Sequence, residues 1–451
     1  MIDPTILFPE GPREAFETAP ASLLAVSSRV DYRDALAPGD PRYVPTAEAR
    51  AEKFVRHFHA TFGYDKHSGG FLPPGQGKHV LFFGHVGCGK STELSRMCQE
   101  LEDPHRYWVV RIDLLELIDA HDARYSDVWL AVAQKLVDKL EEQGIGVEPV
   151  VLNRLRNWFA ERVLTHEELG ELKAGIDFEA SAGAGLPLIA KLLARFTTSV
   201  KVGSSYRETL RTVMRNSYGD FVAALNLLIT NAAAKIRAAG KGQEILFVID
   251  GADRFRGEDW RRFFVEEVNQ LVLVRCIAVY TAPMALKSSG ARLDLFDSLV
   301  LPMVKLHEFD AANSRREAGF TAMRQVVLKR CHYRLFDSLE TLDRLIEFSG
   351  GHLRDLLRLL YFACIEAEGA VLDSASVEAA AQRLASEYRS WVLAEDYPIL
   401  VEAARQPQNL GVSEAVTRLV EGGALLEYNS GSWRQPHPVV RLLPAYLRAA
   451  G

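Results

Sequence analysis

Residues Gly84–Ser91 read GHVGCGKS and match the pattern Gly-x4-Gly-Lys-Ser of a phosphate-binding loop. The loop follows the apolar run His79–Phe83 (HVLFF), which predicts a short buried strand. The residues from Ser91 to about Leu101 continue as a predicted helix. Strand, loop and helix in this order are the context that the motif requires, so a chance glycine turn explains the pattern poorly.

Each residue type in this loop has a physical role in holding a nucleotide. Gly87 and Gly89 let backbone N–H groups turn inward around a β-phosphate, and the helix start near Lys90 adds its positive end. Lys90 is expected to reach the β- and γ-phosphates, and the Ser91 hydroxyl to be a ligand of Mg²⁺. Cys88 is interpreted as a small residue at a variable position, with a redox switch as the alternative. The predicted cofactors are ATP and Mg²⁺, with nucleotide contacts at Gly84, Gly87, Cys88, Gly89, Lys90, Ser91 and Thr92.

A second motif places a carboxylate at the end of another predicted strand. Residues 246–253 read LFVIDGAD, so four apolar residues lead directly to Asp250. In an open α/β sheet the carboxyl end of a strand faces the ligand crevice. Asp250 is therefore the carboxylate expected near Mg²⁺, together with Ser91 as the second metal-binding residue.

The residue after Asp250 is Gly251, where many ATPases have a Glu that orients the attacking water. Asp253 is the nearest substitute for that Glu, and Glu258 is a weaker one. The alternative for Asp253 is a solvated turn or an ion pair with Arg254. Slow or gated hydrolysis is a consequence of this departure. The sequence has no Asn-Lys-x-Asp segment, so nothing favours guanine.

Five apolar runs alternate with predicted helices, which indicates an α/β fold with a parallel sheet covered on both faces. The strand Trp108–Asp113 lies between the two motifs, and we interpret it as an extra strand inserted between the phosphate-loop strand and the acidic strand. Predicted helices cover residues 46–62, with Thr46 as the cap, and residues 126–143 and 206–239. The predicted strands are His79–Phe83, Trp108–Asp113, Glu244–Asp250, Val274–Thr281 and Leu299–Leu306.

The 451 residues are too many for one compact core and predict several domains. Residues 1–45 are expected to form an irregular leader, and residues 46–308 a P-loop ATPase domain with a helical insertion at about 145–240. Residues 309–392 are expected to form an all-helical lid. The last segment, 393–451, shows two helices and then a hairpin with its turn near residues 429–431.

Three more polar residues are candidates for contact with the terminal phosphate. Thr281 ends the fourth predicted strand, although an ordinary strand-end Thr is an equal alternative. Arg292 lies in a short polar segment before the fifth strand, where an unpaired surface Arg is equally plausible. Arg354 lies in the first turn of a helix opened by residues 350–355 (GGHLRD), where a cation is unfavourable for the helix itself. A local pair with Asp355 is the alternative for Arg354.

Together these features resemble AAA+ ATPases of the initiator-like branch, near the STAND group of signalling ATPases. The resemblance implies that Thr281 is a sensor 1 residue, Arg292 an arginine finger for a neighbouring subunit, and Arg354 a sensor 2 residue. It implies an AAA+ lid after residue 309 and a C-terminal winged helix, with Ser413–Glu421 as its second helix and Ala424–Val440 as its wing. The implied catalytic residues are Lys90, Asp250, Asp253, Thr281, Arg292 and Arg354.

The phrases GHVGCGKSTEL and DPRYV (residues 40–44) also resemble an uncharacterised bacterial ATPase family. Several of its members are found among genome-conflict and phage-defence genes. This resemblance implies an ATP-driven switch that forms homo-oligomers and controls a co-encoded protein effector. A DNA-binding initiator or loader is an alternative, and a STAND-like signalling scaffold with weak hydrolysis is another.

Composition and charge limit the partners. The net charge is −6, so no global field attracts nucleic acid. Residues 397–451 carry five arginines, four glutamates and no lysine, so the charge does not support DNA binding by the winged helix. Ala180–Phe196 is small and apolar; we expect an exposed insertion or subunit contact there, with a membrane-surface helix as the alternative.

Targeting signals and cysteine usage indicate a location. The N-terminus has no apolar core typical of a signal peptide, and no run of about 18 apolar residues predicts a transmembrane segment. The five cysteines form no Cys-x-x-Cys pair, which disfavours a zinc site and a disulfide framework. The expected location is therefore the reducing cytoplasm.

Overall fold

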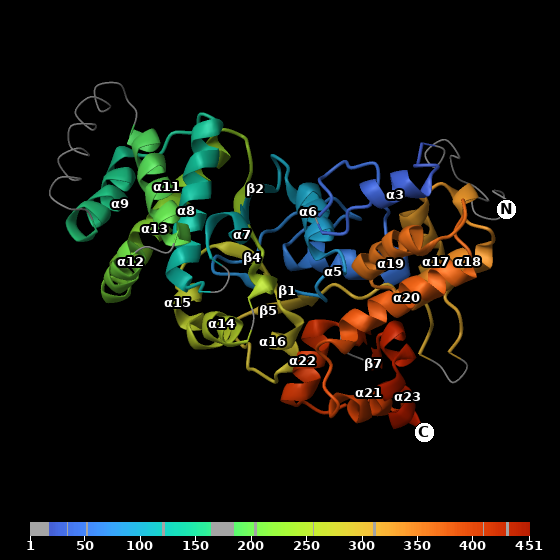
Figure 1. Cartoon of the computed structure of the whole chain (residues 1–451). Coiled ribbons are helices and arrows are strands. Elements are labelled where there is room, and N and C mark those ends of the chain that lie inside the picture. Colours follow the sequence, from blue (N-terminus) through green and yellow to red (C-terminus); the bar gives the residue numbers. More distant parts are fainter. Residues whose placement is uncertain are drawn as a thin grey trace.

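The computed structural model describes residues 18–33, 35–50, 53–119, 122–163, 185–202, 205–255, 257–309, 313–408, 410–429 and 433–451 (Figure 1). Its centre is a five-stranded sheet with the order β2-β3-β4-β1-β5, in which every pair of neighbours is parallel. The predicted α/β fold with a five-stranded parallel sheet is confirmed. The strands are β1 (His79–Phe83), β2 (Tyr107–Asp113), β3 (Glu244–Asp250), β4 (Ile277–Ala282) and β5 (Asp297–Val300).

The strand that separates the two motifs in space is β4, and this corrects the role expected for Trp108–Asp113. That stretch is β2, which lies at the edge of the sheet and pairs only with β3, with Asp113 opposite Asp250. β4 lies between β1 and β3, with Thr281 opposite Phe82 of β1. Position along the sequence thus does not give position in the sheet, because parallel strands are joined by crossovers.

The fifth strand is shorter and begins earlier than the predicted Leu299–Leu306. β5 ends at Val300; the Leu301 N–H still donates to the Phe83 carbonyl of β1 over 2.8 Å, and the buried residues after it belong to no strand. The lid packs closely on the backbone here: a Cβ on Gly351 would lie 1.9 Å from the Val304 carbonyl oxygen, and a Cβ on Gly319 would lie 1.9 Å from the carbonyl oxygen of Lys305. Leu301 and Met303 instead pack in the core beside Val80 and Phe82.

Helices cover both faces of the sheet and form two separate cores. On one face α5 (Phe54–Thr61) and α6 (Lys90–Leu101) pack on Val80 and Phe82. On the other face α8 (Tyr125–Glu142) and α13 (Tyr218–Ala238) pack on the strand residues that point the opposite way, such as Leu81. This alternation follows from the two-residue period of a strand. The single helix predicted for 46–62 is instead α4 (Ala47–Arg50) and α5, with residues 51–52 outside the described part.

The described part of the predicted insertion is helical. It contains α9 (Pro149–Arg162), α11 (Gly185–Val202), α12 (Ser205–Asn216) and α13. The prediction of one long helix over 206–239 is therefore wrong, because the helix is interrupted at Ser217, between α12 and α13. Residues 164–184, with the start of the Ala180–Phe196 segment, lie outside the described residues. The rest of that segment is the first part of α11, which packs on α8 and buries Ile189, Leu193 and Phe196, so its apolar face is covered by the chain itself, while Lys191 and Arg195 are exposed. The expected subunit contact stays a prediction.

Among the described residues, α13 is the one helix long and apolar enough to cross a membrane. Ten of its residues are buried, and it packs against α9 and β3. A core helix passes the same test of length and composition, and its buried residues make α13 part of the core.

The chain after the sheet is helical as expected, and a hairpin follows near the C-terminus. The lid contains α17 (Glu317–Leu328), α18 (Leu339–Ser349), α19 (Leu353–Glu366) and α20 (Ser374–Arg389). The C-terminal segment contains α21 (Asp396–Arg405), α22 (Glu414–Gly422), the antiparallel hairpin β6 (Leu425–Tyr428) with β7 (Trp433–Pro436), η5 (Pro438–Leu442) and α23 (Pro444–Ala450). The order helix, helix, hairpin is the one predicted. The smaller elements are α7 (Leu114–Leu117), η1 (Ala252–Arg254), α14 (Glu258–Arg261), η2 (Arg262–Glu266), α15 (Val268–Val272), α16 (Met284–Ser288) and η3 (Tyr333–Leu335).

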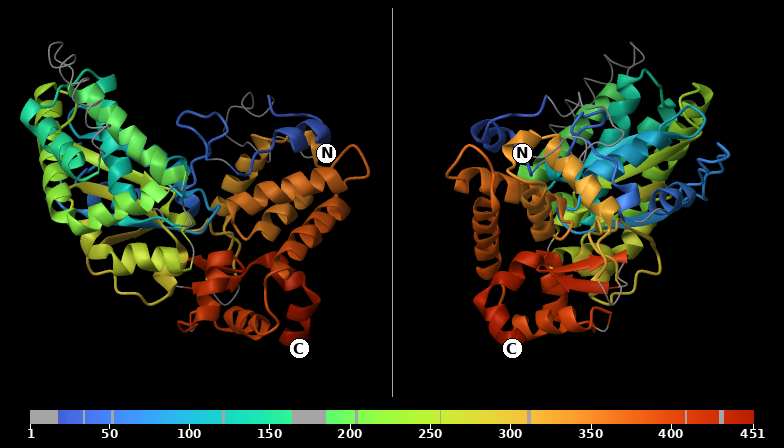
Figure 2. Two further views of the ribbon diagram at one scale, coloured as in Figure 1. Left: turned by 60° about the vertical axis from the view of Figure 1, so that its left-hand side comes forward. Right: turned by 90° about the vertical axis from the view of Figure 1, so that its right-hand side faces the viewer.

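The described part of the expected leader is not wholly irregular, since it contains the helix α3 (Leu23–Arg29), which packs on α19 of the lid. Figure 2 shows two lobes: the sheet with its insertion forms one, and the lid with the C-terminal segment forms the other. The N-terminal segment lies along the lid in the same views. The phosphate loop, at the carboxyl end of β1, faces this second lobe.

Candidate nucleotide site

The phosphate loop has the backbone that its glycines predict, and the lid packs directly on it. Gly87 and Gly89 have φ values of +92° and +94°, a left-handed conformation that favours glycine. A Cβ on Gly87 would lie 2.7 Å from the Cβ of Arg354. The N–H of Arg354 donates to the Gly87 carbonyl over 3.0 Å. Both glycines are therefore required by the turn, and Gly87 also by the close approach of α19.

Lys90 is buried and has three partners. Its ammonium donates to the carbonyl oxygens of Gly84 and His85, at 2.7 and 3.0 Å, within its own loop. It also forms an ion pair with Asp253, in which Nζ lies 2.8 Å from Oδ2. The Lys90 charge is thus held at the loop and neutralised by a carboxylate from the end of β3.

Gly251 explains how Asp253 reaches Lys90. Its φ of +91° turns the chain out of β3 directly after Asp250 and starts the short helix η1. That turn brings the buried Asp253 side chain to the loop. Burial alone would raise the pKa of Asp253, but the charge and hydrogen bond of Lys90 outweigh burial and hold that pKa below its usual value. Asp253 therefore pairs with Lys90, and the solvated turn considered from sequence is not what the structure has.

Asp250 lies beside the expected metal-binding hydroxyl. Its carboxylate accepts a hydrogen bond from the N–H of Gly251 at 2.8 Å, and the Ser91 hydroxyl lies near it. Burial raises the pKa of Asp250 and repulsion from Asp253 adds to this shift, while the Ser91 hydroxyl opposes it. Thr281 also lies close enough to Asp250 to lower the pKa of Asp250. The Thr281 hydroxyl is buried and has no hydrogen-bond partner within the described residues.

These oxygen atoms fit Mg²⁺. A hydroxyl and a carboxylate in contact are hard oxygen donors, and Mg²⁺ is commonly held by one or two protein oxygens together with phosphates and water. No group of three or more His, Cys, Asp or Glu residues in the described ranges makes a complete metal site by itself. Ser91 and Asp250 are thus the residues that would hold Mg²⁺ brought by a nucleotide.

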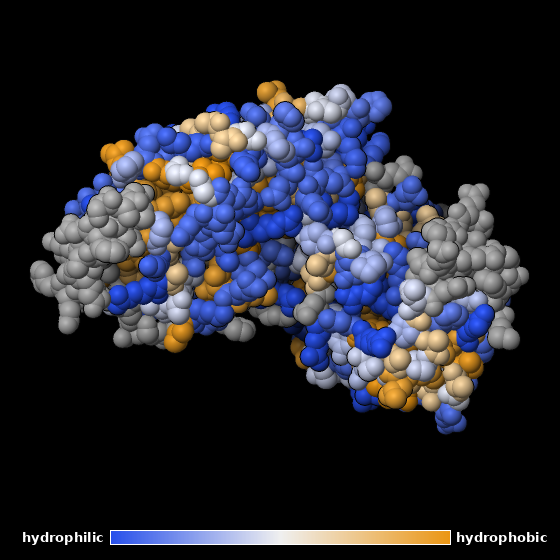
Figure 3. All heavy atoms as spheres, turned by 90° about the horizontal axis from the view of Figure 1, so that it is seen from above, coloured by the Kyte–Doolittle hydropathy of each residue, from blue (hydrophilic) through white to orange (hydrophobic). Residues whose placement is uncertain are grey.

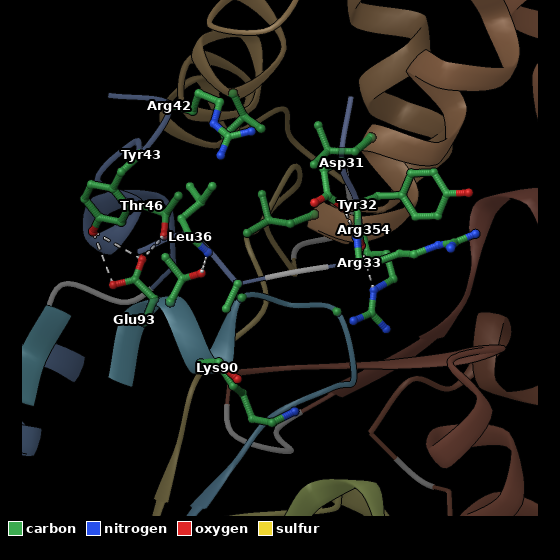
Figure 4. A pocket seen from close by; sticks show the side chains of 18 of the residues that line it. Asp31, Tyr32, Arg33, Leu36, Arg42, Tyr43, Thr46, Lys90, Glu93 and Arg354 are labelled. Carbon is green, nitrogen blue, oxygen red and sulfur yellow. Dashed lines mark hydrogen bonds between the residues drawn. The ribbon is translucent and has the colours of Figure 1, made fainter. Parts of the chain in front are cut away.

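Lys90 and Ser91 line a pocket, and a segment before the sheet, which no sequence pattern predicts to be there, forms one wall of it. The N–H of Leu36 donates to the Thr92 hydroxyl over 3.1 Å, and the Thr46 hydroxyl lies 3.0 Å from the carboxylate of Glu93. Tyr43 bonds to the same carboxylate. Figure 4 shows Tyr43, Thr46 and Glu93 at one end of the pocket and Tyr32, Arg33 and Arg354 at the other, with Lys90 below.

The lid forms the opposite wall. Leu353, Arg354 and Leu357 of α19 line the same pocket as Lys90 and Ser91. Arg354 Nε donates to the Tyr32 carbonyl over 3.1 Å, so the Arg354 side chain joins the lid to the N-terminal segment. Burial and the nearby Arg254 guanidinium lower the pKa of Arg354. Arg254 is exposed and lines the pocket too, so two guanidinium groups and Lys90 surround the space next to Asp253.

Arg50 is a further residue that the sequence did not single out. It is 1% exposed and joins three parts of the chain. Its guanidinium donates to the Cys88 carbonyl of the phosphate loop at 2.6 Å, to the Thr46 hydroxyl at 2.8 Å and to the Pro302 carbonyl. Arg50 thus fixes the loop from behind, while Cys88 itself is a buried free thiol.

The structure brings most of the predicted residues together, but not all of them. Lys90, Ser91, Thr92, Asp253 and Arg354 line one pocket, and Asp250 with Thr281 lies at its sheet end. Arg292 is exposed in the loop between α16 and β5, without an ion pair to the described part of the chain. Glu258 is exposed in the first turn of α14 and does not line this pocket.

Comparison with known proteins finds distant structural likenesses, including these two. A Walker-type ATPase of Pyrococcus abyssi superposes with a TM-score of 0.40 at 14% identity, over 92% of this chain and 98% of that chain. Cdc6p from Pyrobaculum aerophilum gives a TM-score of 0.37 at 11% identity, over 92% of this chain and 96% of that one. No family model and no curated protein matches the sequence.

Proposed function

We propose that the chain is a Mg-dependent, ATP-binding and ATP-hydrolysing molecular switch of the AAA+ type. One observation carries the proposal: both carboxylates at the end of β3 meet the phosphate loop, Asp253 in an ion pair with Lys90 and Asp250 near the Ser91 hydroxyl. Phosphoryl transfer requires this combination of a phosphate cradle, a metal site and a group that orients water. The base of ATP is assigned to the space between the N-terminal segment and α19.

Phosphate release tests this proposal. The wild-type chain is expected to release phosphate from ATP only with Mg²⁺, and Ser91→Ala is expected to lower that rate because it removes a metal ligand. Ser386→Ala, the same change at an exposed position of α20, serves as a matched surface control. Phosphate release that persists in EDTA, or that is unchanged in Ser91→Ala, would contradict the proposal.

The switch is proposed to work as a homo-oligomer in which Arg292 completes the site of a neighbouring subunit. The support is the exposure of Arg292 beside β5 and its lack of an ion pair in the described ranges. An arginine supplied in trans makes turnover depend on assembly. The rate per subunit should therefore rise with protein concentration, and a rate that stays flat over a wide range would argue against assembly.

Control of a co-encoded effector in phage defence is the part of the proposal that rests on the sequence resemblance alone. The face in Figure 3 is mainly hydrophilic, with small separate apolar areas, so it suggests no partner site by itself. A plaque assay with the native gene neighbourhood tests the idea. Protection that is lost with Lys90→Ala is expected, and equal plating with and without the genes would contradict it.

DNA loading is the second candidate, and the charges of the C-terminal segment weigh against it. Arg418 of α22 is bonded by both terminal nitrogens to Asp396, each at 2.9 Å. The Thr417 hydroxyl bonds to the Ser288 carbonyl, so α22, the helix that would read DNA, packs against α16. Binding of duplex DNA at low salt with Mg-ATP would favour this candidate, and no binding there would remove it.

A signalling scaffold with weak hydrolysis is the third candidate, favoured by Gly251 in place of a Glu. It differs from the first only in turnover. Single-turnover measurements with Mg-ATP separate the two, because a scaffold would hold unhydrolysed ATP while a switch converts it.

A further inference from the structure

The phosphate-loop residue His85 contacts the C-terminal segment. Its side chain is buried, and Nε2 accepts a hydrogen bond from the N–H of Glu427 in β6 at 2.9 Å. Burial lowers the pKa of His85 to about 3, so the ring is neutral and Nε2 can accept. His85 lines a separate cavity from the one lined by Lys90 and Ser91.

Glu427 is fixed on the hairpin side of this contact. Its side chain is 1% exposed and forms ion pairs with Lys287 of α16 at 2.8 Å and Arg434 of β7 at 3.0 Å. α16 begins two residues after β4, the strand that ends in Thr281 and Ala282. The hairpin is therefore anchored both to the phosphate loop and to the segment that follows the central strand.

A second connection runs through the lid. His352 Nε2 lies 2.8 Å from the Val86 carbonyl of the phosphate loop. Asp355 lies 3.3 Å from His352 Nδ1 and 3.2 Å from Nε2 of His437, the residue after β7. The Tyr388 hydroxyl of α20 donates to the same carboxylate over 2.8 Å. His85 thus contacts β6 directly, while Val86 is connected through His352 and Asp355 of the lid to His437, the residue after β7.

We propose that the hairpin β6–β7 positions the phosphate loop through His85, so that nucleotide affinity depends on the docked hairpin. The inference rests on the proposed ATP binding. His85 acts as a positioning residue, since its ring contacts the hairpin while its carbonyl accepts from Lys90. Coupling between two sites is reciprocal, so the nucleotide in turn stabilises the docked hairpin.

The test compares His85→Gln, which keeps an acceptor, with His85→Leu, which removes it and leaves the Glu427 N–H unpaired. Titration of wild type and variants with Mg-ATP is expected to show affinity lowered about 5- to 10-fold by His85→Leu, the usual effect of one lost hydrogen bond. His85→Gln should retain most of the affinity. Urea unfolding checks that both variants remain folded.

A variant outside the loop keeps the proposal testable if His85→Leu does not fold. Lys287→Met removes one of the two ion pairs of Glu427 without changing the loop, and it should lower the affinity for Mg-ATP severalfold. Lys241→Met, on an exposed turn, is the control. Amide exchange at residues 425–428 should slow when wild type binds Mg-ATP, and should not change in His85→Leu.

The outcomes separate the two claims. Wild type that fails to bind Mg-ATP would overturn the proposed function and this inference with it. Wild type that binds, with His85→Leu and Lys287→Met both binding equally well and with unchanged exchange in β6, would overturn the inference alone. Weaker binding by both variants, with rescue in His85→Gln, is the result expected.

Discussion

Lys90 and Asp253 form a buried ion pair, with Nζ 2.8 Å from Oδ2. The lysine of the phosphate loop is therefore neutralised by the second acidic residue of the strand-end motif, while the first, Asp250, faces Ser91. A bound phosphate and Asp253 would compete for the same ammonium group. We therefore propose separate roles for the two carboxylates: Asp250 for the metal, and Asp253 for Lys90 and the attacking water.

Asp253→Asn should strengthen Mg-ATP binding and slow its hydrolysis. The change removes a negative charge beside the phosphates and releases Lys90, so we expect affinity to rise by about tenfold or less. Turnover should fall about 100-fold or more if Asp253 orients the attacking water. Binding titration and phosphate release measure the two effects. Glu258→Gln, an exposed change, is the control, and normal turnover in Asp253→Asn would remove Asp253 from the reaction.

Gly251→Ala should destabilise the chain, since Gly251 has a φ of +91° and a Cβ there would lie 3.1 Å from Leu115 Cγ. A left-handed non-glycine residue costs about 1 kcal/mol, and the close contact adds to it. Gly219→Ala in α13 is the matched control: its Cβ would meet nothing within 4 Å, and the free energy of unfolding should rise slightly. Urea unfolding of both variants measures this, and equal changes would contradict the account of Gly251.

The predictions from sequence were accurate where the structure depends on neighbouring residues. β1, the glycine loop and α6 follow one another directly, and β3 is an apolar run that ends in Asp250, so periodicity and turn chemistry define them. β1, α6 and β3 are confirmed. The sequence also placed Arg354 and Lys90 in one candidate site, because both lie at helix starts that follow glycines, and both residues line one pocket.

The errors concern contacts between distant parts of the chain. The residues after Val300 are buried by the lid at Val304 and by the core of the sheet face at Leu301 and Met303, and apolarity alone did not distinguish this burial from pairing in a strand. The N-terminal wall was missed because its contacts, such as Leu36 with Thr92, join segments without periodicity. The central place of β4 depends on crossover topology, which local patterns do not encode.

Arg292→Ala should lose ATP hydrolysis, and mixing this variant with Lys90→Ala should restore part of it. If Arg292 acts on a neighbouring site, a subunit with Lys90→Ala can supply the arginine to a subunit with Arg292→Ala. Each variant alone should be at least about 100-fold slower than wild type, and an equimolar mixture should recover part of the rate. Arg261→Ala, in α14, is the control for loss of a surface charge. An inactive mixture of two folded, assembled variants would argue against Arg292 as the arginine in trans.

Acid should destabilise the chain through its buried neutral histidines. Burial lowers the pKa of His79 to about 4 and that of His85 to about 3, from 6.5. The unfolded chain binds these protons near pH 6.5 and the folded chain does not, so stability is complete above pH 6.5 and falls as the pH drops.

Each of these two histidines should contribute about 1.4 kcal/mol per pH unit to that slope between pH 5.5 and 4.5. His79→Gln removes one titrating group, so its unfolding free energy should fall less steeply with acid than that of wild type. Urea unfolding at several pH values measures the slopes. Parallel slopes for the two proteins would show that His79 is not held neutral.

Calorimetric titration of the chain with Mg-ATP is the decisive measurement of nucleotide binding. We expect saturable binding of one nucleotide per chain to the wild type, lost on Lys90→Ala and retained in Lys241→Ala, an exposed lysine outside the site. Wild-type protein that binds no Mg-ATP, or a folded Lys90→Ala variant that binds it as tightly as wild type, would show that the loop is not a nucleotide site.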